Sequence, residues 1–126
     1  MSTEIAKGAG PLSDDVVLVR DKAVLDNMRI MVERNMEELV ASKYLLNKLF
    51  IAVTQLILNR INNDIRELHR EMRKRQIKIL NEEQADNILY FRFTCRGYED
   101  RFGIMREVLR TEISTRLGMY VKAAIG

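Results

Sequence analysis

Apolar residues recur every three or four positions along much of this chain. From Ala23 onwards charged residues separate the apolar ones, which are Leu25, Met28, Val32, Met36 and Leu39. The same spacing returns near the end of the chain, at Phe102, Met105, Leu109, Ile113, Leu117 and Tyr120. Side chains at this spacing share one face of an α-helix. Both segments therefore predict amphipathic helices.

The pattern widens between Tyr44 and Ile61, where polar residues occupy only a narrow stripe. A helix that is apolar around most of its circumference must be covered on more than one side. In a chain of 126 residues, other segments can cover only part of it. We therefore expect this helix to lie in a homo-oligomer interface, carried by Leu46, Leu49, Phe50, Val53, Leu56 and Ile57.

Residues 12–96 contain neither glycine nor proline. Both residues are typical of turns, because glycine adopts positive φ and proline presets a turn. Their absence favours an all-α fold, in which long amphipathic helices form a helical bundle completed by oligomerisation. We expect a flexible N-terminal tail over residues 1–12 and a single helical domain over residues 13–126.

Several element boundaries stay open at this point. The β-branched run Val16–Val19 is also compatible with a short strand. Asn62–Asp64 is the best position for a helix break, unless one helix runs from Ala23 to Leu80. Asn81–Gln84 matches a capping box and predicts a helix start. Ile88–Phe93 is then expected to be a buried helix, although Tyr90–Thr94 alternates like a strand. A bend is expected near Gly97.

Charge, hydropathy and cysteine content indicate the compartment in which the protein works. The formal net charge is +3, and no apolar run approaches the roughly 20 residues that a membrane helix needs. The first residues lack the pattern of a secretory signal. Cys95 is the only cysteine, which excludes an intramolecular disulfide and fits a reducing compartment. We expect a cytoplasmic protein that does not associate with membranes.

Basic residues are concentrated in one stretch after the apolar segment. Residues 60–80 carry seven basic and three acidic side chains. On a helix, several of the basic ones would form a strip that can neutralise phosphates. This strip is a candidate nucleic-acid contact and comprises Arg66, Arg70, Arg73, Lys74, Arg75 and Lys78. The alternative is a solvated face in which Glu67 and Glu71 pair with the arginines.

No residue pattern points to catalysis, a cofactor or a metal. His69 is the only histidine and has no companion at ligand spacing. Cys95 has no neighbouring catalytic partner in the sequence, and phosphate-binding glycine motifs do not occur. No small-molecule substrate is identified. An enzyme would have to use converging arginines that hold a small anion.

The sequence thus favours a non-enzymatic helical interaction, regulatory or assembly protein. It would act as a homo-oligomer and bind another macromolecule, which we expect to be a protein. The alternative is a nucleic-acid-binding protein that uses the strip from Arg66 to Lys78.

Overall fold

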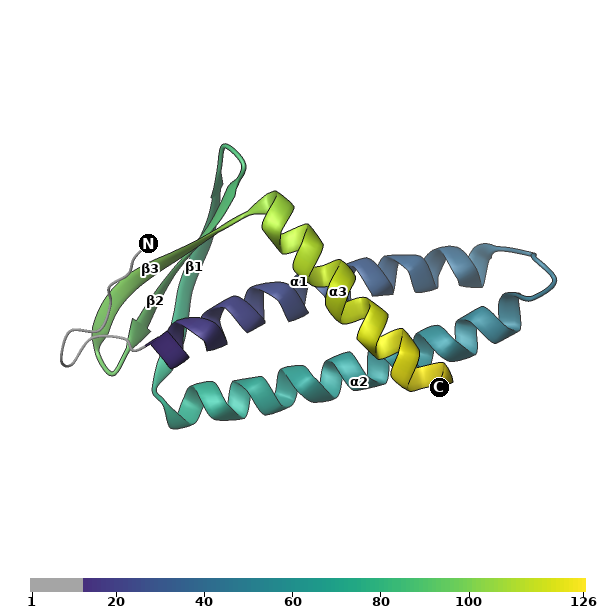
Figure 1. Cartoon of the computed structure of the whole chain (residues 1–126), viewed down its shortest axis with the longest axis horizontal. Helices are drawn as coiled ribbons and strands as arrows, with labels where there is room; N and C mark the ends of the chain where they lie inside the picture. Colours follow the sequence, from purple (N-terminus) through teal and green to yellow (C-terminus); the bar gives the residue numbers. More distant parts are fainter. Residues whose placement is uncertain (1–12) are drawn as a thin grey trace.

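The computed structural model describes residues 13–126, and its longest feature is a helical hairpin. Helix α1 (Ser13–Ala41) and helix α2 (Asn47–Lys74) run antiparallel (Figure 1). The apolar face predicted from Leu25 to Leu39 packs against α2, which contributes Ile57, Ile61 and Ile65 to the core. The one-sided amphipathic helix is therefore confirmed. Val16–Val19 lies within α1, so the alternative of a strand there is wrong.

The hairpin turns at Ser42–Leu46 and not at Asn62–Asp64. Asn47 explains the position of the turn, because its buried side-chain amide donates hydrogen bonds to the carbonyls of Leu39 and Ser42. Those carbonyls lie at the end of α1, where the helix has no partners of its own for them. The predicted break at Asn62–Asp64 is wrong, and so is one rod from Ala23 to Leu80.

A three-stranded antiparallel sheet follows the hairpin. Its strands are β1 (Ile77–Ala85), β2 (Ile88–Cys95) and β3 (Tyr98–Met105), in the order β1-β2-β3. The sheet lies beside the end of the hairpin where α1 begins and α2 ends (Figure 1). In β2 every second residue is buried, and Phe93 and Cys95 are fully inaccessible to solvent. The alternation noticed at Tyr90–Thr94 therefore marks a strand with one face against the helices.

The prediction of an all-α helical bundle is wrong, because the sheet occupies residues 77–105. Its turns need little glycine. Asp86 and Arg96 adopt positive φ themselves, at 55° and 51°, and Gly97 alone supplies the glycine of the second turn. The absence of glycine before Gly97 was therefore misleading, since aspartate tolerates the left-handed region better than most residues. The bend expected at Gly97 is confirmed.

The capping-box match at Asn81–Gln84 is also wrong, because both residues lie inside β1. Pairing with the apolar face of β2 overrides the local preference for a helix start. Leu80 is an extra residue where the register shifts between Ile79 and Asn81, which is a β-bulge. The predicted buried helix over Ile88–Phe93 is replaced by β2.

Helix α3 (Arg106–Ile125) follows β3 directly and crosses the hairpin (Figure 1). Leu109 and Ile113 are buried, and Leu117 and Tyr120 pack against the same core. The predicted C-terminal helix is therefore confirmed from Arg106, whereas Phe102 and Met105 belong to β3. The expected tail over residues 1–12 lies outside the described residues. Within residues 13–126, no helix combines the length and apolar character needed to cross a membrane.

The conformation of Asp86 allows the observed β1–β2 turn to be tested against the helix that the sequence predicted over these residues. In the left-handed region alanine costs about 1–2 kcal/mol more than glycine. In a helix interior the order is reversed, with glycine about 1 kcal/mol worse than alanine. We predict that Asp86→Gly is more stable than Asp86→Ala in urea unfolding. If the alanine variant is the more stable, the turn at Asp86 is contradicted.

Candidate functional site

The end of the hairpin farthest from the sheet exposes a group of large apolar side chains. They lie on the last turn of α1, the Ser42–Leu46 loop and the first turns of α2. Their exposed fractions run from 47% at Phe50 to 97% at Leu45. We call this group the distal patch, and it consists of Val40, Tyr44, Leu45, Leu46, Leu49, Phe50 and Leu56.

The distal patch remains exposed because α3 crosses the hairpin far from the Ser42–Leu46 loop. Arg116 on α3 pairs with Asp21 on α1 at 2.5 Å, and the Tyr120 hydroxyl donates to the Asp64 carboxylate on α2. Only five residues of α3 follow Tyr120, a length of about 8 Å. The part of α2 between Asn47 and Asp64 is about 26 Å long. The third helix therefore cannot reach the loop.

Most of the predicted interface residues lie on this surface. Leu46, Leu49, Phe50 and Leu56 are exposed in the distal patch. Val53 is partly buried against the core, and Ile57 belongs to the core itself. Sequence reasoning missed Val40, Tyr44 and Leu45. The signal was present in the run Tyr44-Leu45-Leu46, but a loop position was not expected there.

The predicted basic strip is divided among α2, β1 and the turn between them. Arg66, Arg70, Arg73 and Lys74 lie exposed on α2, while Lys78 lies on β1. Arg66 donates to Asn63, and Arg70 pairs with Glu67 at 3.5 Å, as the solvated-face alternative proposed. Arg75 points into the protein, where its Nη1 lies 3.2 Å from Asp15 Oδ1. Nucleic-acid binding stays a prediction, with four side chains on one face of α2 to carry it.

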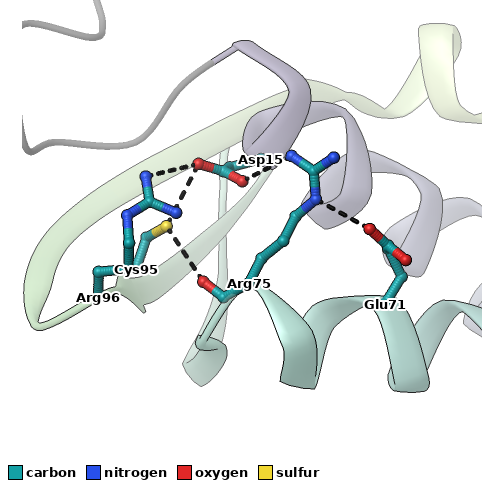
Figure 2. A network of polar contacts seen from close by, with 5 residues as sticks. All are labelled: Asp15, Glu71, Arg75, Cys95 and Arg96. Carbon is teal, nitrogen blue, oxygen red and sulfur yellow. Dashed lines mark hydrogen bonds and ion pairs between the residues drawn. The ribbon is translucent and has the colours of Figure 1, made fainter.

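Asp15 is the centre of a buried polar network (Figure 2). Its carboxylate is fully inaccessible to solvent in the first turn of α1. Besides Arg75, the Nη2 of Arg96 lies 3.0 Å from Asp15 Oδ2, and the Cys95 thiol lies 3.3 Å from the same oxygen. Arg75 also pairs with Glu71 at 3.1 Å. We call this network the Asp15 clamp, and it comprises Asp15, Glu71, Arg75, Cys95 and Arg96.

The Asp15 clamp joins three parts of the fold. Asp15 lies in the first turn of α1, Arg75 follows the last residue of α2, and Cys95 and Arg96 lie where β2 turns into β3. A buried carboxylate is costly unless hydrogen bonds and opposite charges satisfy it. Two partly exposed guanidinium groups supply both, which holds the sheet against the open end of the hairpin.

The thiol and the imidazole of the described region both have shifted pKa values. Burial, followed by the hydrogen bond to Asp15, raises the pKa of the Cys95 thiol to about 11. A thiol with so high a pKa is a poor nucleophile at neutral pH. His69 lies 3.3 Å from Lys22 Nζ, and partial burial followed by the Lys22 charge lowers its pKa. Within residues 13–126 no group of three or more histidine, cysteine or acidic residues is placed to bind a metal.

Comparison with known proteins assigns the family. The model of the family described as YhjD protein matches residues 11–125, which include every helix and strand. This chain belongs to the YhjD family. No curated protein and no solved structure matches the chain.

The Asp15 clamp of this YhjD-family chain can be tested with two neighbouring carboxylates. Asp14 and Asp15 share the first turn of α1, but Asp14 is exposed. Asp15→Asn removes the charge that two guanidinium groups face, so we predict a loss of about 3 kcal/mol in the free energy of unfolding. Asp14→Asn makes the same chemical change at the same helix end and is predicted to cost less than about 1 kcal/mol. Equal losses in urea unfolding would show that the clamp contributes nothing specific.

Proposed function

We propose that this chain is a non-enzymatic interaction protein that acts as a homo-oligomer and binds another macromolecule. In the proposed assembly, the distal patch packs against the distal patch of a second copy. The observation that carries the proposal is the exposure of seven large apolar side chains at one end of the hairpin. The largest apolar patch on a typical monomer covers only about 300–600 Å².

The size of the distal patch supports a second copy as its occupant. At roughly 200 Å² for a large side chain, the exposed fractions amount to about 900 Å² for each chain. A stable interface of standard size buries about 800 Å² on each partner. The patch therefore supplies the area of a complete dimer interface.

The composition of the patch supports the same occupant. Between Tyr44 and Asn59 the only charged residue is Lys48, so little charge has to be buried when two patches meet. In a two-fold interface the same surface is used by both chains, which suits an apolar patch without a charge pattern of its own. Two hairpins packed in this way would place four helix segments around a common apolar centre.

Sedimentation velocity over a range of concentrations tests the proposal. We predict a dimer for the unmodified chain and a monomer for Leu49→Glu, because the variant places a charge in the centre of the apolar contact. Leu49 is exposed in the single chain, so the variant keeps its fold, which circular dichroism checks. Met119→Glu is the matched control, since Met119 is similarly exposed but lies on α3, and it is predicted to remain a dimer.

Two results would overturn the proposal. One is an unmodified chain that stays monomeric at every concentration. The other is a Leu49→Glu variant that associates as the unmodified chain does. A monomer that floats with phospholipid vesicles, and loses this behaviour on Leu49→Glu, would instead assign the distal patch to a membrane surface.

A further inference from the structure

A second surface of the molecule has different chemistry from the distal patch. An open cleft of about 440 Å³ lies between α1, α3 and the neighbouring parts of β1 and β2. Its innermost side chains are Leu89, Leu109 and Ile113, which are buried. Ile30 and Met31 line it as well and are about half exposed. The cleft therefore has an apolar lining that remains open to solvent.

Two helical faces form opposite walls of this cleft. On α1 the lining positions are 27, 30, 31 and 34, and on α3 they are 106, 109, 110 and 113. Both sets follow the helical spacing of three and four residues, so each is one continuous face. Each face combines apolar side chains with arginine: Arg34 on α1, and Arg106 and Arg110 on α3.

These three arginines differ from the arginines that stabilise the fold. Arg75, Arg92, Arg96 and Arg116 all form ion pairs with acidic side chains. Among residues 13–126, no ion pair or side-chain hydrogen bond satisfies the guanidinium groups of Arg34, Arg106 and Arg110. Of the described residues that line the cleft, Glu82 alone is acidic, so this lining has an excess of two positive charges.

We propose that this cleft binds a small organic anion that has a carboxylate or phosphate head and an apolar body. Guanidinium groups bind both heads through charge-assisted hydrogen bonds, and the exposed apolar lining can cover the body. The side-chain amide of Gln84 lies in the same lining and can donate to the head, whereas the Asn27 amide already donates one N–H to the Ala23 carbonyl at 2.8 Å. The volume is in the range of small-molecule sites, which is about 300–1,000 Å³.

Isothermal titration calorimetry with three ligands of one chain length tests the proposal. Decanoate and decyl phosphate carry the two anionic heads, whereas decanol has the same apolar body without the charge. We predict that at least one of the anions binds at least about tenfold more tightly than decanol. The anion that binds more tightly identifies the preferred head. Because the contact includes charges near solvent, added salt should weaken the binding.

Variants locate the binding in the cleft. The double variant Arg34→Gln, Arg110→Gln removes both positive charges but keeps polar side chains, and it is predicted to weaken anion binding about tenfold or more. The double variant Arg60→Gln, Lys122→Gln is the matched control, since both side chains are exposed outside the cleft, and its affinity should be unchanged. Both variants change exposed side chains, and their unfolding in urea checks that the fold is intact.

Three results would overturn the proposal: no binding of either anion, equal binding of decanol, or an affinity that the double variant leaves unchanged. Leu49→Glu separates this site from the distal patch. We predict that it binds the anion as the unmodified chain does, whatever its state of association. If Leu49→Glu abolishes the binding, the ligand occupies the distal patch and the cleft proposal is wrong.

Discussion

The buried carboxylate of Asp15 determines where the sheet can attach. Its partners Arg75 and Arg96 come from the end of α2 and from the turn between β2 and β3, so both ion pairs form only when these three segments meet. This requirement places the sheet at the open end of the hairpin. The opposite end, about 42 Å away along the 28 residues of α2, receives no cover from the sheet. The position of the sheet at the open end of the hairpin thus accounts both for the Asp15 clamp and for the exposure of the distal patch.

Helix α3 packs against both of the other helices. Its first half faces α1 across the arginine-lined cleft, and its second half reaches α2 at Asp64. Burial and the hydrogen bond to Asp64 raise the pKa of the Tyr120 phenol above its ordinary value. The phenol therefore keeps its proton and remains a hydrogen-bond donor to Asp64. A single 20-residue helix cannot both close the cleft and cover the loop. Two surfaces of different character therefore remain open, one apolar and one cationic.

The helices were predictable because their apolar positions keep one helical period. The interface prediction came from the unusually broad apolar surface near Phe50.

The sheet was not predictable from the glycine and proline content of its turns. Its first turn uses Asp86 in the left-handed region, and the capping-box match at Asn81–Gln84 favoured a helix. Within residues 77–105, only the alternation at Tyr90–Thr94 indicated a strand. The clamp and the cleft join residues far apart in the sequence, such as Asp15 with Arg96 or Arg34 with Arg110. No local pattern connects such residues before the fold is known.

If the distal patches of two copies meet, the two hairpin loops lie close together, and the distance between them is the most direct test of this packing. A spin label on Lys43→Cys would report that distance by pulsed electron paramagnetic resonance. The native Cys95 is buried and its pKa is raised to about 11, so it should resist labelling. Patch-to-patch packing predicts a separation between chains shorter than the hairpin itself, which is about 42 Å long. The absence of any distance between chains, or a separation of about twice that length, would contradict it.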